Sequence, residues 1–310
     1  MTRIIIGAVG AFTVLFLTVF GLAPRLFSVS YDSAAIATKA AEVAKQEKVA
    51  AESVPDTRPT VEHVPLPPQV KAIYMTSCVA GTPNFRQKLL TVMQETEINA
   101  VVVDIKDFSG TISFAPTDPA LLPAWENARC GARDMRELLQ MLHDNKVYVI
   151  GRITVFQDPF YAERHPELAV KRADGVTVWR DGKGLAFIDV AAHDYWDYII
   201  KLSTDSYNLG FDELNFDYVR YPSDGNMVDI SFTHSIASEY KGDKQANLEA
   251  FFRYLNEKLD NETLFAAYKH LNTGRASSTP YTSADLFGMT TTNFDDLSIG
   301  QVQDRAAPYF

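Results

Sequence analysis

Apolar and polar residues alternate along the chain in two periods, one typical of strands and one typical of helices. Apolar, β-branched runs of strand length occur at 70–76, 100–108, 147–156, 211–222 and 282–291. Between and after them, apolar residues recur at helical spacing at 82–97, 132–145, 193–208, 244–259 and 295–307. Strands that alternate with helices predict a parallel sheet with right-handed crossovers.

Polar residues within these strands fall on one face. Because strand side chains alternate between faces, Leu214 and Phe216 share one face of the fourth strand. Glu213, Asn215 and Asp217 lie on the other face. This strand therefore has an apolar face suited to a helix layer and a polar face that continues to its C-terminal end.

The other strands repeat this arrangement. Asp104 and Lys106 share the polar face of the second strand. Arg152 ends the third strand, and Asp285 lies near the end of the fifth. Charges under a helix layer would be costly, which disfavours a doubly wound sheet. In a (β/α)8 barrel the inner face opens at the C-terminal mouth, so we predict an α/β fold of this TIM type over residues 70–310.

The number of strands is lower than a closed barrel requires. Such a barrel has eight strands, whereas five are clear in this sequence. The segment 264–271 fits a strand as well as a helix, and a strand there would separate those of Asp217 and Asp285. The barrel is therefore expected either to be truncated at its C-terminus or to contain strands that the pattern hides.

The N-terminal segment forms a separate unit. Residues 4–23 are an uncharged apolar run, long enough to span a ~30 Å hydrocarbon core as a helix. The run exceeds the apolar part of a cleaved signal peptide and is followed by Pro24 and Arg25. We therefore favour an uncleaved transmembrane anchor over 1–25, with secretion after signal cleavage as the alternative. Arg3 favours a cytoplasmic N-terminus, which places the rest of the chain outside the cytoplasm.

Residues 26–69 have the composition of a stalk. Ala, Lys and Glu dominate 34–51, and the prolines of 53–68 favour an extended spacer. We therefore expect a membrane anchor, a stalk and one globular domain.

Composition and motifs exclude several functions. The net charge is −10 and the pI is near 5.1, and no basic stripe occurs that would bind nucleic acid. The six histidines form no H-E-x-x-H motif and no C-x-x-C occurs, so no metal site is expected. No phosphate loop, dinucleotide fingerprint or G-x-S-x-G motif occurs, so no cofactor is expected.

The two cysteines are predicted to form a disulfide. An exported domain folds in an oxidising compartment, where paired cysteines persist. Cys78 follows the first strand, and Cys130 precedes the second barrel helix. Both therefore lie in loops at the C-terminal mouth of adjacent strands, where a Cα separation of ~5.5 Å is feasible. Two unpaired thiols are the alternative.

Six blocks of sequence carry a resemblance to a known family. They are, in chain order, KAIYMTSCVAGT, NAVVVDIKDFSG, YVIGRITVFQDP, WRDGKGLAFIDV, FDELNFDYVRYPSDG and SADLFGMTT. Over residues 70–310 the chain resembles a family of glycoside-hydrolase domains, formally of unknown function, which is similar to α-amylase and α-galactosidase-type barrels. The resemblance implies an export-linked, carbohydrate-active barrel in which Asp217 matches the carboxylate at the end of strand four. It also implies further strands beyond 295–307.

Glycoside hydrolysis normally needs two carboxyl groups beside the scissile bond. We predict Asp217 as the nucleophile, with Arg220 nearby to keep it ionised. Asp285 is the predicted acid if its strand neighbours that of Asp217, because adjacent strands lie ~4.8 Å apart. Glu213 is too deep to be this partner. The alternatives are a rim salt bridge between Asp217 and Arg220, a capping or loop role for Asp285, and an acid beyond residue 310.

A further set of residues is predicted to bind the sugar. The set is Asp104, Lys106, Arg152, Asn215, Arg220 and Trp179. An ion-pair network at the barrel floor and local packing of Trp179 are the alternatives. The chain is thus interpreted as a membrane-anchored glycoside hydrolase of an envelope or extracellular polysaccharide. The alternative function is a tethered, non-catalytic carbohydrate-binding barrel.

The anchor can be tested by membrane fractionation. Because residues 4–23 are unbroken and apolar, we expect the full-length protein in the detergent phase at its uncleaved mass. A soluble product that begins after about residue 25 would show that the segment is a cleaved signal instead.

Overall fold

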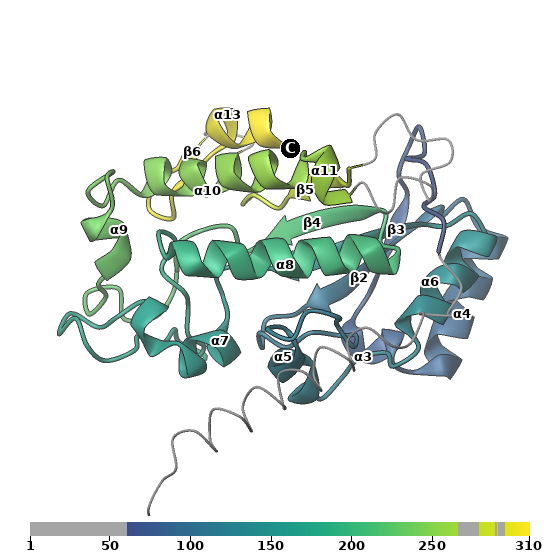
Figure 1. The fold of residues 1–310 in the computed structure, drawn as a ribbon, viewed down its shortest axis with the longest axis horizontal. Helices are drawn as coiled ribbons and strands as arrows, with labels where there is room; N and C mark the ends of the chain where they lie inside the picture. The colour runs from purple at the N-terminus through teal and green to yellow at the C-terminus, as the bar shows by residue number, and fades with distance from the viewer. Residues whose placement is uncertain (1–60, 266–278, 289, 291–294) are drawn as a thin grey trace, which may run out of the picture. The chain divides into compact units, whose positions relative to one another are not determined.

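The computed structural model describes residues 61–265, 279–288, 290 and 295–310, which all belong to one compact unit (Figure 1). The predicted anchor over 1–25 and most of the stalk lie outside these residues. In the described part of the chain, no helix has the length and apolar character needed to cross a membrane.

The centre of the unit is a five-stranded parallel sheet in the order β1-β2-β3-β4-β5. Its strands are β1 (Ala72–Met75), β2 (Ala100–Lys106), β3 (Tyr148–Thr154), β4 (Glu213–Asp217) and β5 (Tyr281–Ala284). Every strand pairs with the one that precedes it in the chain, which is the order that successive βα units produce. The predicted α/β fold with a parallel sheet is confirmed.

β4 and β5 are direct neighbours. Phe216 pairs with Ala284, and the backbone N–H of Asp285 donates to the carbonyl of Phe216 at 2.9 Å. The ambiguous segment 264–271 therefore places no strand between them. Its first residues belong to the short helix α11 (Glu262–Phe265), and 266–278 lie outside the described residues.

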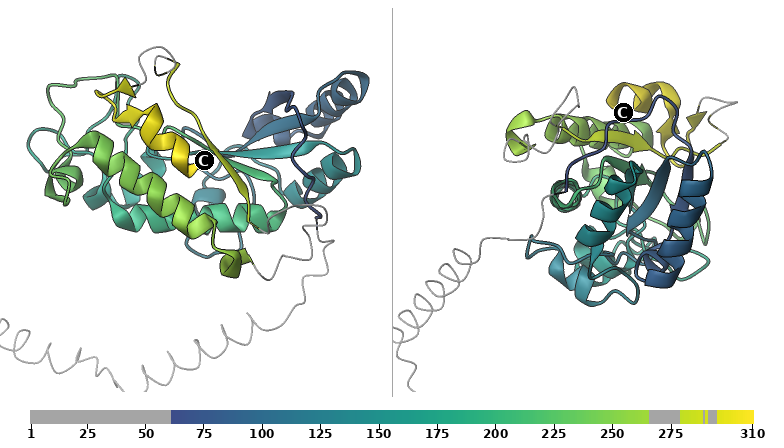
Figure 2. Two further views of the ribbon diagram at one scale, coloured as in Figure 1. Left: turned by 90° about the horizontal axis from the view of Figure 1, so that it is seen from above. Right: turned by 90° about the vertical axis from the view of Figure 1, so that its right-hand side faces the viewer.

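Four long helices agree with the helical periodicity of the sequence. They are α4 (Pro83–Glu95), α6 (Met135–Asp144), α8 (His193–Leu209) and α10 (Lys244–Leu259). α8 and α10 lie side by side along the sheet (Figures 1 and 2). The shorter helices are α3 (Ser77–Ala80), α5 (Leu122–Glu126), α7 (Pro159–Arg164), α9 (Thr233–Ala237) and α13 (Gln303–Ala306), with 3₁₀ turns at Pro166–Leu168 and Ala307–Tyr309.

The two faces of the sheet have different surroundings. On the apolar face, Val103, Ile153 and Phe216 are fully buried in the main core with residues of the long helices. The other face carries polar residues that are mostly half-buried, as the burial pattern of β4 shows. The predicted division into a helix-covered face and an open polar face is confirmed.

The predicted helix over 295–307 is wrong. The segment forms the antiparallel strands β6 (Asp295–Asp296) and β7 (Gln301–Val302) and then α13. Gly300 makes the turn between the strands with a φ of 83°, a conformation that favours glycine. The side chain of Gln301 is fully buried and bonds to the backbone of Val219 and Phe287. These long-range bonds override the local helical spacing.

The globular unit begins earlier than the predicted boundary at residue 70. Val61 and His63, which were expected in the stalk, are buried at 1% and 4% exposure. The His63 ring stacks on Tyr207 of α8, and its Nδ1 lies 3.2 Å from Asp212 Oδ1. A short leader before β1 is therefore part of the domain.

Asp212 holds this leader to the domain. Its buried carboxylate accepts hydrogen bonds from the backbone N–H groups of Val64 and Val149, each at 2.8 Å. His143 Nε2 lies 2.9 Å from the same carboxylate. Burial by itself would raise the pKa of Asp212, but the hydrogen bonds of His143 and His63 hold it below its usual value.

The predicted disulfide is confirmed. Cys78 in α3 and Cys130 in the loop before α6 are bonded, with a Cα separation of 4.6 Å. The backbones of Gly81 and Gly131 meet beside this bond, where a Cβ on Gly81 would lie 2.3 Å from the carbonyl oxygen of Gly131. The bond therefore ties α3 closely to the loop between α5 and α6.

We expect Asp212→Asn to lower the free energy of unfolding at pH 7 by about 3 kcal/mol, because it removes a buried charge from its donors. The folded-state pKa of Asp212 lies below its unfolded value. Its stabilisation is therefore present above about pH 3.9 and is lost as pH falls through the folded pKa. Urea unfolding at pH 7 and at about pH 2.5 measures this difference.

The control is Asp144→Asn, an exposed position on α6, which should change stability by less than about 0.5 kcal/mol. A stability difference for Asp212→Asn that is equal at both pH values would contradict the charged role.

Candidate active site

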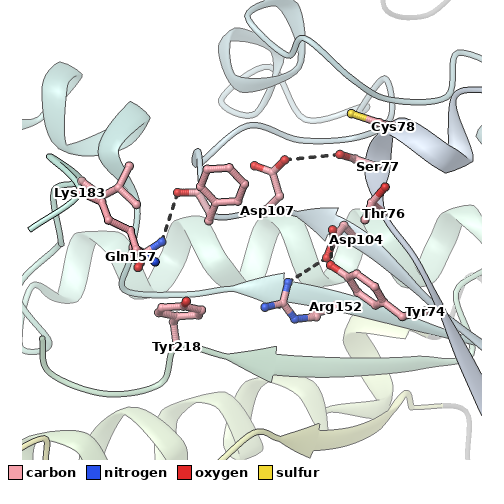
Figure 3. A pocket seen from close by; sticks show the side chains of 12 residues that line it. Tyr74, Thr76, Ser77, Cys78, Asp104, Asp107, Arg152, Gln157, Lys183 and Tyr218 are labelled. Carbon is pink, nitrogen blue, oxygen red and sulfur yellow. Dashed lines mark hydrogen bonds and ion pairs between the residues drawn. The ribbon is translucent and has the colours of Figure 1, made fainter. Parts of the chain in front are cut away.

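The parallel register brings polar side chains together at the C-terminal ends of the strands. Asp104 of β2 pairs with Arg152 of β3, which pairs with Asn215 of β4. Tyr74 of β1 lies at one end of this row, and Figure 3 shows its phenol directed at Asp104. The row lies on the open face of the sheet, as the strand alternation predicted.

Arg152 is the centre of this row. Its Nη1 donates to Asp104 Oδ1 at 2.9 Å, and its Nε donates to Asp217 Oδ2 at 3.0 Å. The Nη2 group also bonds to Asp217. Partial burial disfavours the charged guanidinium, but the two carboxylates outweigh this effect and raise the pKa of Arg152. Arg152 therefore stays cationic and fixes both carboxylates.

Asp104 is the most buried of the charged residues in this row. Burial raises its pKa, although hydrogen bonds from Tyr74 and Arg152 oppose this shift. The Tyr74 hydroxyl donates to Asp104 Oδ2 at 2.5 Å. Burial and the adjacent Asp104 carboxylate raise the pKa of the Tyr74 phenol, so it remains a donor over the physiological pH range.

Asp217 is the predicted nucleophile, and its partner is Arg152 rather than Arg220. Its second oxygen, Oδ1, accepts from the backbone N–H of Tyr218 at 2.6 Å. Tyr218 has a φ of 53°, which is uncommon for a residue other than glycine and is typical of strained functional sites. The turn after β4 therefore aims a backbone donor at Asp217.

Asp285 follows β5 and lies beside Asp217 in the sheet register. Asn215 Nδ2 donates to Asp285 Oδ1 at 3.2 Å and to Ser283 Oγ at 3.1 Å. Asp285 is exposed at the rim, yet the protein atoms around it and the negative charge of Asp217 raise its pKa. The two predicted catalytic carboxyl groups thus lie on neighbouring strands in unlike surroundings.

Glu213 lies one layer deeper and is held in a separate cluster. Ser283 Oγ donates to Glu213 Oε1 at 2.6 Å, and the Tyr148 hydroxyl donates to Glu213 Oε2 at 3.1 Å. Its place below Asn215 agrees with its exclusion from the catalytic pair.

Lys106 does not line the site, contrary to the prediction. The pairing of β2 with β3 shifts between Asp104 and Lys106, and this bulge pairs Lys106 with Ile153 of the apolar face. The lysine is fully buried, and its Nζ lies 3.0 Å from Asp158 Oδ2. Burial lowers the pKa of Lys106, and the Asp158 carboxylate opposes this effect.

Trp179 and Arg220 also lie elsewhere than predicted. Trp179 is 2% exposed, packs on Phe187, and donates its Nε1 proton to the carbonyl of Asn226. It is therefore a packing residue of the loop after β3. Arg220 is 8% exposed, and its guanidinium lies between the rings of Tyr218 and Phe287, at 4.9 and 4.5 Å.

A cavity of about 660 Å³ opens beside Tyr74, Asp104 and Arg152 of this row. Its lining residues do not include Asn215, Asp217 or Asp285. Figure 3 shows its walls, which include several residues that the sequence reasoning missed. These are Tyr74, Thr76, Ser77, Asp107, Phe108, Gln157, Lys183, Leu185 and Tyr218. Most of them come directly after a strand of the sheet. Because active sites of such folds form at the C-terminal ends of the strands, this position in the sequence could have identified them. Phe108 is 57% exposed and offers an apolar surface at the rim.

The described residues include no group of three or more His, Cys, Asp or Glu side chains arranged to hold a metal ion. The chemistry that the cavity wall can supply is that of carboxyl groups, a guanidinium, an ammonium group, phenols, hydroxyls and one amide.

Comparison with known proteins places the chain in a family. Residues 72–309 match a family model described as "Putative glycosyl hydrolase domain". The chain belongs to this family. The resemblance to glycoside-hydrolase domains that the sequence predicted is therefore confirmed, and it covers almost the whole globular unit. None of the curated proteins matches the chain.

Several solved structures are similar to this family member. A hypothetical protein from Ruminiclostridium thermocellum ATCC 27405 is 30% identical, with a TM-score of 0.55, over 70% of this chain and 98% of its own. TtGalA, the α-galactosidase from Thermus thermophilus, is 12% identical with a TM-score of 0.40, over 64% of this chain and 37% of its own. α-L-fucosidase isoenzyme 2 from Paenibacillus thiaminolyticus is 12% identical with a TM-score of 0.47, over 70% of this chain. This chain covers 32% of the fucosidase, so it spans about a third of each enzyme.

Proposed function

We propose that this domain is a glycoside hydrolase that cleaves an envelope or extracellular polysaccharide with Asp217 and Asp285 as its catalytic pair. The observation that carries the proposal is that these two carboxyl groups lie at the C-terminal ends of adjacent strands, on the open face of the sheet. Membership in a family described as glycosyl hydrolases supports it.

The surroundings of the two carboxyl groups suit different roles. Asp217 accepts hydrogen bonds from Arg152 and from the backbone N–H of Tyr218. Asp285 has a raised pKa, which favours the protonated form. Glycoside hydrolysis needs one carboxylate and one carboxyl group that donates a proton, and the raised pKa suits Asp285 to the donor role.

In the proposed reaction, Asp217 attacks the anomeric carbon as the glycosidic C–O bond breaks. Asp285 gives its proton to the departing oxygen, and a glycosyl ester forms on Asp217. The Asp285 carboxylate then removes a proton from water, which hydrolyses the ester and restores both groups. Asp104, Arg152 and Asn215 hold the pair in place and offer hydrogen bonds to sugar hydroxyls.

We also propose that the sheet is part of a (β/α)8 barrel whose domain works outside the cytoplasm. The sequential order of five parallel strands supports the barrel. The disulfide between Cys78 and Cys130 supports an oxidising location. The proposal that residues 4–23 attach the protein to a membrane rests on the sequence alone.

One observation favours the second function, a non-catalytic carbohydrate-binding barrel. Arg152 binds Asp217 Oδ2 through both Nε and Nη2, and the Tyr218 N–H binds Oδ1, so both oxygens of the proposed nucleophile are already hydrogen-bonded. Wild-type protein that binds saccharides by calorimetry but turns over no glycoside in a chromogenic and polysaccharide panel would favour this alternative.

We expect Asp217→Asn to reduce hydrolysis by at least about 10²–10⁴-fold, because the variant cannot act as a nucleophile. Folding and sugar binding should remain close to wild type, since Asn keeps the size of the side chain. Initial rates on the best substrate of the panel measure the loss, and thermal unfolding checks the fold. Asp224→Asn, an exposed position in the loop after β4, is the matched control. Activity of Asp217→Asn within a few fold of wild type would exclude the role.

The acid role of Asp285 predicts a specific pH dependence. Activity requires the protonated group, so it should fall as pH rises through the Asp285 pKa, which lies above that of an ordinary carboxyl. Asp285→Asn should remove this basic limb and slow cleavage of a saccharide leaving group by about 10²–10⁴-fold. Release of 2,4-dinitrophenol, which leaves without protonation, should be far less affected. Equal losses with both leaving groups would contradict an acid role, and Ser283→Ala is the neighbouring control.

A further inference from the structure

A second cavity, separate from the site described above, is lined by Cys130 of the disulfide. It has a volume of about 570 Å³, within the range of small-ligand pockets. It is formed by α5 and by the loop that joins α5 to α6. Its lining residues are Ala115, Trp125, Glu126, Ala128, Arg129, Cys130, Gly131 and Arg133.

The positive groups of this cavity are not neutralised by the protein. Arg129 and Arg133 are both exposed. Within the described residues, neither arginine side chain forms a hydrogen bond or an ion pair, and the carboxylate of Asp134, next to Arg133 in the chain, is bound by Arg86. Glu126 supplies the one carboxylate of the wall. Two guanidinium groups against one carboxylate, on a chain of net charge −10, make this a local site for anions.

Trp125 gives the cavity an aromatic wall with a fixed position. A Cβ on Gly131 would lie 2.7 Å from Trp125 Cζ3 and 2.6 Å from the Ser113 carbonyl oxygen. The loop can approach the indole this closely because residue 131 is glycine. A half-buried indole offers a flat apolar surface of the kind on which a sugar ring packs.

The two cavities share the disulfide as a common wall. Cys78 lines the first cavity, together with Asp104 and Arg152, and Cys130 lines the second one. The two Cα atoms are 4.6 Å apart. The disulfide therefore places the second cavity next to the first.

We infer that the second cavity binds an acidic saccharide unit of the polymer, with Arg129 and Arg133 on its anionic group and Trp125 against its ring. Guanidinium groups bind carboxylates, sulfates and phosphates through paired hydrogen bonds. Two arginines beside an aromatic surface are therefore suited to a sugar ring that carries such an anionic group. The inference rests on the proposed function for the continuity of the saccharide. It adds that the polymer is acidic.

Binding is measured in the full chain carrying Asp217→Asn, so that turnover does not interfere and a failure of catalysis is seen separately. The probes are polygalacturonate, dextran sulfate and uncharged dextran. Trp179 and Trp196 are 2% and 4% exposed, so a change in tryptophan fluorescence on binding reports on Trp125. The carboxylated and sulfated probes distinguish the two kinds of anion.

We expect an acidic probe to bind more tightly than dextran and to weaken as salt is raised from about 0.05 to 0.5 M. Arg129→Ala/Arg133→Ala should weaken this binding at least about tenfold, because it removes two charge-assisted contacts. Arg129→Lys/Arg133→Lys keeps the charge and should recover part of the affinity. The charge-matched control, Arg164→Ala/Arg253→Ala on α7 and α10, should stay within about twofold of the parent.

Two results would overturn the inference. One is that neither acidic probe binds more tightly than dextran. The other is that both alanine double variants lose affinity equally, which would mean that overall charge and not this cavity attracts the polymer. Hydrolysis by the wild-type chain can succeed or fail independently of either result.

Discussion

The parallel, in-register pairing of β1 to β5 is the constraint on which the site depends. Backbone pairing brings the C-terminal ends of all five strands to one edge, and side-chain alternation then separates an apolar face from a polar one. The apolar face is buried by α4, α6, α8 and α10. Because that burial supplies the hydrophobic stabilisation, the opposite face is free to carry charged groups at its open end.

Arg152 organises the charges on that face. It bonds to Asp104 on one side and Asp217 on the other, so both carboxylates have a cationic partner. Asp285 bonds to the neutral amide of Asn215 and lies near the negative Asp217. One shared guanidinium therefore creates unlike environments for two neighbouring carboxyl groups. The strained turn at Tyr218 reinforces the difference, because it directs a backbone N–H at Asp217 alone.

The sequence by itself determined the strands of the sheet, the long helices and the polar face that carries the two predicted catalytic residues. The periods of two and 3.6 residues identified all five strands of the sheet and the four long helices, because burial of one face leaves that pattern in any sequence. Alternation also placed Asp104, Arg152, Asn215, Asp217 and Asp285 on the open face. The disulfide could be predicted because the two cysteines lie in the segments that follow the adjacent strands β1 and β2, and residues after parallel strands meet at one edge.

Only the tertiary structure decided which side chains form ion pairs, where a strand contains a bulge, and which distant residues form hydrogen bonds. The bulge in β2 turns Lys106 to the helix side, and no local pattern marks it. Arg220 is near Asp217 in the sequence, yet the arginine that binds Asp217 is Arg152. The pairing of β3 with β4 brings the side chains of Arg152 and Asp217 within hydrogen-bond distance. The buried Gln301 and the leader residue His63 are held by residues far away in the chain. Local periodicity records which face of an element is buried, whereas the choice of contact depends on the packing of distant segments.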